Sequence, residues 1–264
     1  MKKADALLQK AKKQGRTLLT FAECTELLKM YRIPFCRGTV AADARSAVAA
    51  ARDLGYPVAM KIASPDIVHK SEADGVRLGI GKDGEVRKAF GAIVEAAGKY
   101  KSGAAVEGVL VQSMAPQGVE LVAGAKFSRQ FGPAVMFGMG GISVEVMKDI
   151  VFRLAPVTRD EALAMMKEIQ AAPLLEAFRG RPAVHKAAVA DILEKLSRLV
   201  ADHPEIVEAD LNPIIASGRG AVVADVRMML GEPKRVARTA YTTEQILAAT
   251  RRIFAPRGRE TGKR

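Results

Sequence analysis

The 264-residue sequence contains no tryptophan, two cysteines, three histidines and 5 % aromatic residues. Cys24 and Cys36 are too few for a disulfide framework and lack metal-site spacing, so we expect two small buried thiols in a cytoplasmic protein. No run of about 18 apolar residues is present, which excludes a membrane-spanning helix, and we expect no secretory signal at the basic N-terminus. Apolar residues still make up 49 % of the chain, enough to bury a sizeable core.

The net charge of +12 is concentrated at the two ends of the chain. Residues 1–20 carry +5 and residues 232–264 carry +6, whereas residues 21–231 carry only +1. A nucleic-acid-binding face would spread basic residues over a folded surface with aromatic side chains between them. We therefore expect basic ends that are solvated or docked on an acidic partner, and no nucleic-acid ligand.

Hydrophobic periodicity and turn residues predict helices interspersed with strands. Thr20 and Glu23 have the spacing of a capping box, and Gly55 follows an alanine-rich stretch as a helix-terminating glycine. We expect helices over residues 21–31, 43–54, 85–100, 159–168, 184–201 and 243–253, and strands over residues 38–40, 56–62, 76–80, 108–114, 119–125, 133–137, 144–155, 206–211 and 221–226.

This order of elements predicts a mixed α/β (α+β) fold in two lobes. We place the N-terminal lobe at residues 35–113 and the C-terminal lobe at residues 114–231. A short helical segment, residues 1–34, precedes the lobes, and a C-terminal helix with a basic tail, residues 232–264, follows them.

Two residues of the first lobe are candidates for phosphate chemistry. Lys61 ends the otherwise apolar segment 56–62, and a lysine there is unfavourable to bury unless an anion pairs with it. His69 lies in the polar segment 63–75, and an imidazole nitrogen can hold and pass a phosphoryl group. The alternatives are a strand-end lysine that reaches solvent and a hydrogen-bonded loop histidine.

Glycines follow the apolar strand expected over residues 133–137. Gly138, Gly140 and Gly141 allow backbone N–H groups to approach a phosphate. These glycines form neither a G-x-G-x-x-G fingerprint nor a P-loop, and a tight strand turn explains them equally well.

Oxygen-bearing side chains gather between residues 206 and 226. If the two strands expected there lie side by side in antiparallel pairing, Asp210, Asn212 and Asp225 come together. Two carboxylates and an amide oxygen are hard ligands that suit Mg²⁺, with nucleotide phosphates completing the shell. A polar hairpin turn is the alternative interpretation.

The order of these motifs resembles the ATP-grasp domain of the nucleoside-diphosphate-forming acyl-CoA synthetases. It is most similar to β subunits of ADP-forming acetate–CoA ligases, which are related to succinyl-CoA synthetase β. The resemblance covers residues 15–231 and is carried by the stretches YPVAMKIASPDIVHKSEADGV, FGPAVMFGMGGISVE, and EADLNPI with VVADVR. It implies a two-lobed ATP-grasp fold that holds ATP or ADP with Mg²⁺ and shields the transferred phosphoryl group from water.

The resemblance also implies a role for each matching residue. Lys61 would bind nucleotide phosphates, and His69 would be the second carrier of the phosphoryl group. The other implied residues are Gln112, Ser113 and Met114 at the adenine, Glu120 at the ribose or the hinge, Gly138, Gly140, Gly141 and Glu145 on the loop near the site, and Asp210, Asn212 and Asp225 as Mg²⁺ ligands.

In this family a phosphoryl group passes from an acyl phosphate to a histidine on a CoA-binding α subunit. A mobile loop then carries the group to a second histidine on the β-type domain, and from there it reaches ADP; the reverse direction makes acyl-CoA with ATP. At 264 residues the chain has no room for the CoA-binding domain. We therefore expect a subunit of an acid–thiol ligase that needs an α subunit carrying the first phosphohistidine and most of the acyl pocket, in an α₂β₂ assembly.

Two other functions remain open. A stand-alone ATP-grasp carboxylate–amine ligase would use Lys61 and Mg²⁺ but would have no use for His69, because it works through an acyl phosphate directly. A non-catalytic nucleotide-binding subunit would bind ATP or ADP and regulate a partner without reacting.

Overall fold

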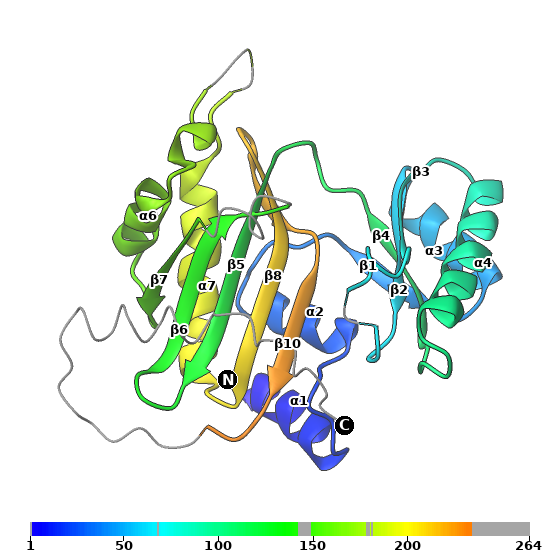
Figure 1. Cartoon of the computed structure of the whole chain (residues 1–264), viewed down its shortest axis with the longest axis horizontal. Helices are drawn as coiled ribbons and strands as arrows, with labels where there is room; N and C mark the ends of the chain where they lie inside the picture. Colours follow the sequence, from blue (N-terminus) through cyan, green and yellow to red (C-terminus); the bar gives the residue numbers. More distant parts are fainter. Residues whose placement is uncertain (1, 68, 142–148, 178–179, 181, 234–264) are drawn as a thin grey trace, which may run out of the picture.

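The computed structural model describes residues 2–67, 69–141, 149–177, 180 and 182–233. These residues form two antiparallel sheets of four and six strands, with helices packed against both (Figure 1). The predicted mixed α/β fold in two lobes is confirmed. The expected helix at residues 243–253 and the basic tail from residue 234 onward lie outside the described residues. Within the described ranges no helix is long and apolar enough to cross a lipid bilayer.

The smaller sheet forms the N-terminal lobe. Its elements are the strands β1 (Gly38–Ala41), β4 (Gly108–Ser113), β2 (Val58–Ala63) and β3 (Val76–Ile80), in this spatial order, and the helices α3 (Ala44–Leu54) and α4 (Asp83–Tyr100). Successive residues of a strand point to opposite faces of a sheet. Met60 and Val111 therefore join the core under the helices, whereas Lys61 and Gln112 point to the face turned toward the other lobe.

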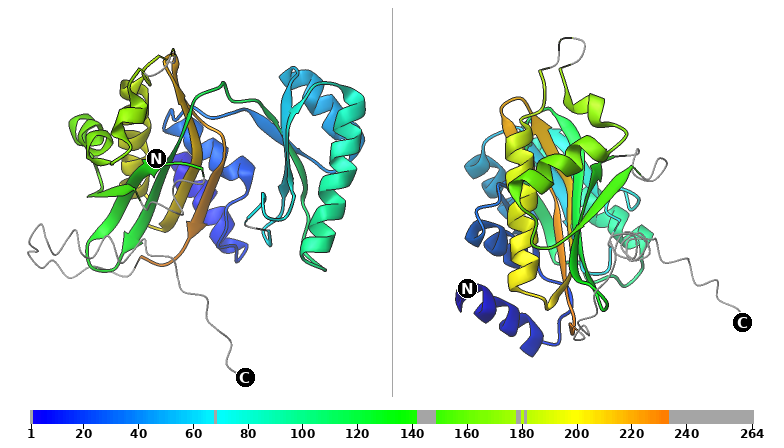
Figure 2. Two further views of the ribbon diagram at one scale, coloured as in Figure 1. Left: turned by 45° about the horizontal axis from the view of Figure 1, so that its top comes forward. Right: turned by 90° about the vertical axis from the view of Figure 1, so that its left-hand side faces the viewer.

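The larger sheet forms the C-terminal lobe. Its strands are β10 (Val226–Leu230), β8 (Ile206–Ser217), β5 (Val119–Ser128), β6 (Gly132–Met139) and β7 (Ile150–Leu154), in this spatial order, with β9 (Gly220–Val223) paired to β8. The helices α6 (Arg159–Glu168) and α7 (Lys186–Asp202) and the short 3₁₀ helix η1 (Ala172–Leu175) complete this lobe, and α7 runs along one face of the sheet (Figure 2).

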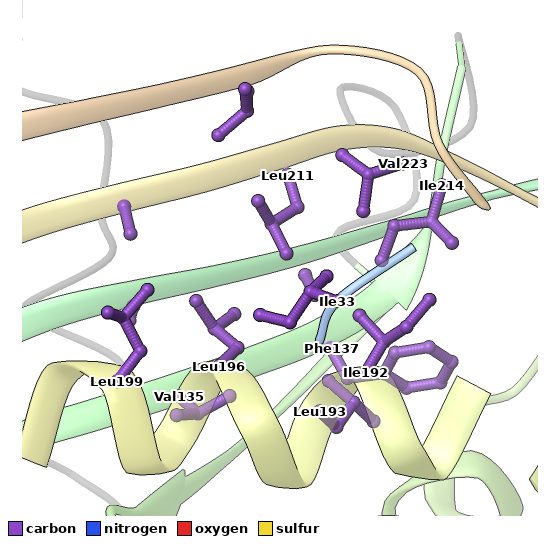
Figure 3. Close-up of a cluster of buried hydrophobic side chains, with 14 of the residues drawn as sticks. Ile33, Val135, Phe137, Ile192, Leu193, Leu196, Leu199, Leu211, Ile214 and Val223 are labelled. Atoms are coloured by element: carbon purple, nitrogen blue, oxygen red, sulfur yellow. The ribbon is translucent and has the colours of Figure 1, made fainter. Parts of the chain in front are cut away.

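An apolar stripe on α7 fixes that helix on the sheet. Leu193, Leu196 and Leu199 recur at helical spacing and point toward Phe137 and Leu211 of the sheet (Figure 3). All five side chains are fully buried, which leaves the opposite face of the large sheet to meet the small lobe. Asp210 and Asn212, which flank Leu211 on β8, point to that opposite face.

The N-terminal helical segment packs with the C-terminal lobe, although it precedes the other lobe in sequence. Its helices are α1 (Lys2–Lys13) and α2 (Phe21–Met30). Leu8 of α1 and Leu27 of α2 are fully buried in the core of the large sheet. A β-bridge joins Leu18 to Met229 at the edge of that sheet. The two ends of the described chain are therefore joined in one lobe.

One predicted strand is divided in the structure. The strand expected over residues 221–226 is in fact two strands, β9 and β10, separated by Ala224 and Asp225. Both strands pair antiparallel with β8, so the predicted adjacency is confirmed and the predicted extent was wrong. Across this break the Ala224 N–H donates to the Pro213 carbonyl and the Asn212 N–H donates to the Asp225 carbonyl at 3.2 Å, so both residues stay beside β8.

Glu23 stabilises the start of α2 and supplies a pH-dependent prediction. The Thr20 and Glu23 side chains each accept a hydrogen bond from the other residue's N–H, which confirms the predicted capping box. The Arg16 guanidinium donates to both Glu23 oxygens, at 2.6 and 2.8 Å, and lowers the pKa of Glu23 to about 2. At pH 7 we expect Glu23→Gln to lower the free energy of unfolding by about 2 kcal/mol in urea denaturation.

The same variant should lose its effect in acid. The Glu23 carboxyl ionises at lower pH in the folded chain than in the unfolded chain, so its stabilisation is present at neutral pH. It is lost as the pH falls from about 4.5 toward 2, and the two proteins should become equally stable there. Glu26→Gln is the control, because Glu26 is exposed and pairs with Lys29 on the same helix. A gap between wild type and Glu23→Gln that does not shrink from pH 5 to pH 3 would contradict this account.

Candidate functional site

A cleft of about 1790 Å³ lies between the two sheets. Its walls come from the inner faces of β2 and β4, the inner face of the large sheet, the chain that links β4 to β5, and residues 15–21. The predicted site residues that line it are Lys61, His69, Gln112, Ser113, Met114, Glu120, Gly141, Asp210, Asn212 and Asp225. Residues far apart in the sequence thus share one cavity.

Lys61 reaches across the cleft from the small sheet. Its side chain is buried, and its Nζ donates to the carbonyl oxygen of Ala224 in the other lobe at 2.7 Å. Burial lowers the pKa of Lys61, and the nearby Asp225 carboxylate partly offsets this effect. A desolvated ammonium gains strongly from an anionic ligand, so Lys61 fits a phosphate-binding role.

Gln112, Ser113 and Met114 lie where the small sheet joins the link to the large one. The Gln112 side chain is buried, and its Nε2 donates to the Cys36 carbonyl at 3.1 Å, so this amide holds the start of β1 in place. The Ser113 N–H donates to the Arg37 carbonyl at 2.8 Å. Met114 is exposed at the cleft, as an apolar contact for a planar ring would be.

The glycine-rich strand end is divided between structural and cleft-facing positions. A Cβ at Gly138 would lie 2.6 Å from the Asp149 carbonyl, and a Cβ at Gly140 would lie 2.9 Å from the Glu120 backbone carbon. Strand packing therefore excludes a side chain at both positions, and neither glycine lines the cleft. Gly141 does line it, with φ +68° and the Glu120 carboxylate close beside it. Glu145 lies outside the described residues.

The three residues expected to hold a metal meet at the junction of β8, β9 and β10. Asp210 and Asn212 lie on β8, and Asp225 lies in the break opposite them. Burial raises the pKa of Asp210 to about 6; Arg227 opposes this shift, and the Asp225 and Glu208 carboxylates reinforce it. A carboxylate disfavoured by burial and by like charges gains from a cation, and two carboxylates with an amide oxygen suit Mg²⁺. The residues present therefore fit that ion.

His69 stands at the rim of the cleft. Its side chain is 68 % exposed, and its Nδ1 lies 3.6 Å from a carboxylate oxygen of Glu72. The backbone carbonyl of His69 accepts a hydrogen bond from the Ala73 N–H, which closes the turn that presents the imidazole. The ring is accessible both to the cleft and to a second protein, as a phosphoryl carrier must be.

Lys70 is a further residue of the cleft, which the sequence did not lead us to expect. Its Nζ donates to both carboxylate oxygens of Asp225, at 2.7 and 2.9 Å, and so joins the two lobes beside the expected metal ligands. Its position directly after His69 could have indicated a role in the site. A charged residue in a loop is usually solvated, however, so this position alone does not predict a contact. Asp74 has a φ of +50°, which is the left-handed conformation that glycine adopts freely. Arg77 pairs with the Asp74 carboxylate at 2.8 Å and supports this turn.

Comparison with known proteins agrees with this geometry. The family profile described as "ATP-grasp domain" matches residues 10–230. The β subunit of acetate–CoA ligase [ADP-forming] I of Pyrococcus furiosus is 46 % identical over 228 residues, which cover 86 % of this chain and 98 % of that protein. The 4-hydroxybutyrate–CoA ligase [ADP-forming] of Nitrosopumilus maritimus is 44 % identical over 86 % of this chain but only 33 % of its own length. The chain thus corresponds to almost a whole subunit of the first relative and to a third of the longer second relative.

A solved structure shows the same architecture. It is the dinucleotide forming acetyl-coenzyme A synthetase 1 of Ca. Korarchaeum cryptofilum, in complex with coenzyme A, Ca-AMPCP and HgCl⁺. The two structures superpose with a TM-score of 0.83 at 42 % sequence identity, covering 86 % of this chain and 99 % of that chain. At the level of the family, these findings confirm the predicted ligase class and the use of ATP or ADP with Mg²⁺. This chain belongs to the ATP-grasp family, among the β subunits and β-type domains of ADP-forming acyl-CoA ligases.

Proposed function

We propose that this chain is the nucleotide-binding β subunit of an ADP-forming acyl-CoA synthetase, which couples acyl-CoA, ADP and phosphate to acid, CoA and ATP. The observation that carries the proposal is the single cleft shared by the buried Lys61, the exposed His69 and the oxygen ligands Asp210, Asn212 and Asp225. The β-subunit relatives, which this chain matches over almost their whole length, support it independently.

The cleft provides positioning and charge neutralisation, which phosphoryl transfer requires. In the direction of ATP synthesis, a β-phosphate oxygen of ADP attacks the phosphorus held on a ring nitrogen of His69. The new P–O bond forms as the P–N bond breaks, and the imidazole keeps the electron pair of that bond. Lys61 neutralises phosphate charge throughout, and the two lobes exclude water. Mg²⁺ held by Asp210, Asn212 and Asp225 would supply further neutralisation of the phosphates.

We propose that the partner is a CoA-binding α subunit that carries the first phosphohistidine and most of the acyl pocket, in an α₂β₂ complex. The exposed position of His69 at the cleft rim supports a delivery from another chain. One structure of the Korarchaeum enzyme contains a phosphorylated phosphohistidine segment, and another has the phosphohistidine segment pointing towards the nucleotide binding site. The match to a third of the longer Nitrosopumilus enzyme also supports a second component.

We propose domain boundaries at residues 35–113 and 114–231, with residues 1–34 and 232–264 flanking them. Two separate buried cores support this division, one drawn from Ala41 to Val111 and the other reaching from Val119 to Leu230. The second core also includes the N-terminal helices. We propose a cytoplasmic location, which the two buried free thiols, Cys24 and Cys36, support.

Phosphoryl labelling tests the proposed function. The purified chain is incubated with Mg²⁺ and γ-³²P-ATP, with and without the α subunit, and the label is located by quenching and mass spectrometry. We expect an acid-labile, base-stable label on His69 that added ADP removes. Bound ATP without any label, even with the α subunit present, would instead indicate a carboxylate–amine ligase or a regulatory subunit.

A further inference from the structure

Two lysines of the N-terminal lobe hold the same short segment of the other lobe. Lys70 Nζ donates to both carboxylate oxygens of Asp225, and Lys61 Nζ donates to the neighbouring carbonyl of Ala224. The side chains of Lys70 and Asp225 are only 25 % and 23 % exposed. Partly buried charge pairs are screened less than surface pairs, so this contact contributes to holding the lobes together.

Lys70 belongs to a compact turn that also carries His69. The Ala73 N–H donates to the His69 carbonyl, and the Gly75 N–H donates to the Lys70 carbonyl at 2.8 Å, so residues 69–75 form one unit. Within the part of the chain that the structure describes, the hydrogen bonds and ion pairs that join this turn to the other lobe all come from Lys70. The placement of His69 against the C-terminal lobe is therefore linked to the Lys70–Asp225 contact.

The carboxylate that Lys70 binds is also an expected Mg²⁺ ligand. An ammonium and a divalent cation repel each other when both contact one partly buried carboxylate. Lys61, whose Nζ contacts the adjacent Ala224 carbonyl, and Arg227, which lies opposite Asp210 in the β8–β10 ladder, add further positive charge nearby. Lys70 and a divalent cation therefore compete for Asp225.

We propose that the Lys70 ammonium takes the place of a divalent cation at the Asp225 carboxylate. It pairs with this carboxylate while the site holds no divalent cation and leaves it when the cation binds, which frees the turn that presents His69. The inference rests on the proposed function, because it assumes that the cation and the phosphoryl relay share this cleft. Lys70 is thus a positioning residue that keeps the carrier histidine docked until the nucleotide site is loaded.

Metal binding provides the first test. The full chain and its Lys70→Met variant are titrated with Mn²⁺ alone, and free Mn²⁺ is followed by electron paramagnetic resonance. Since the competing ammonium is gone, we expect Lys70→Met to bind Mn²⁺ about 5- to 20-fold more tightly than wild type. Lys70→Arg should stay near wild type, as should Lys99→Met, which removes an exposed lysine outside the cleft. Equal or weaker Mn²⁺ affinity in Lys70→Met would overturn the inference and would indicate that Lys70 assists ligand binding.

Amide hydrogen exchange of residues 69–75 provides the second test, and it separates the contact from a general effect of charge. Mn²⁺ should speed exchange of this turn several-fold in wild type, whereas in Lys70→Met the exchange should be fast without metal and unaffected by it. Equal exchange in the two metal-free proteins would overturn the inference even if Mn²⁺ binds. Failure of all variants to bind Mn²⁺ would instead overturn the proposed metal site itself, so the two failures can be distinguished.

Discussion

Replacing His69 with asparagine should abolish phosphoryl labelling of the chain and lower acyl-CoA-dependent ATP synthesis with the α subunit by at least about 10³-fold. The asparagine amide nitrogen has no free electron pair with which to hold a phosphoryl group. The substitution should leave the fold intact, because the histidine side chain is 68 % exposed and lies 3.6 Å from the similarly exposed Glu72 carboxylate on the same turn. Nucleotide affinity, measured by calorimetry, should therefore stay close to that of wild type.

A second histidine provides the matched control for this experiment. His185 is the N-cap of α7, and its Nδ1 accepts a hydrogen bond from the Ala188 N–H at 3.1 Å. Asparagine is a favourable N-cap, so His185→Asn should retain both stability and labelling. Synthesis that survives in His69→Asn would remove the histidine relay from the proposed function and leave the carboxylate–amine ligase as the better interpretation.

Replacing Lys61 with methionine should weaken ADP binding by about 100-fold while changing the free energy of unfolding by less than about 1 kcal/mol. The charged hydrogen bond to a nucleotide phosphate disappears, whereas methionine has nearly the length of the lysine side chain. Burial lowers the pKa of Lys61, so at neutral pH the folded chain carries this ammonium unfavourably compared with the unfolded chain. Lys61→Met removes this unfavourable burial of charge, and the gain in stability offsets the loss of the hydrogen bond to the Ala224 carbonyl.

Calorimetric titration with ADP and urea denaturation together check this prediction. Lys99→Met is the control, because Lys99 is exposed on α4 and pairs with Glu95 of the same helix. Lys61→Arg should not restore full affinity, since the larger planar guanidinium does not fit a site shaped for one ammonium. If Lys61→Met binds ADP as wild type does, the lysine only joins the two lobes, and the phosphates must be held elsewhere in the cleft.

Local features of the fold were predictable because they depend on neighbouring residues. Asp43 caps α3 through the Ser46 N–H, and Gly55 ends the helix with φ +85°, close to the expected bounds. The alternation of residues along β2 places Lys61 on the face away from the helices. The order of the motifs was enough to name candidates for phosphate binding, metal binding and phosphoryl transfer.

The role of Gly138, Gly140 and Gly141 could not be predicted from neighbouring residues. A glycine that approaches a phosphate and a glycine that approaches a strand give the same sequence signal. Only the close approach of the Asp149 carbonyl to Gly138, and of the Glu120 backbone to Gly140, distinguishes these two from Gly141 at the cleft.

The helix caps, the strand faces and the chemical groups available to the site could be predicted in advance, because they follow from residue type and short-range spacing. The packing of the N-terminal helices with the C-terminal lobe, and the contact of Lys70 with Asp225 at 155 positions' distance, emerge only in the folded chain. A contact of that kind depends on how two separately packed cores are set against each other. No local pattern at either residue encodes it, so it becomes visible only when the cleft is assembled.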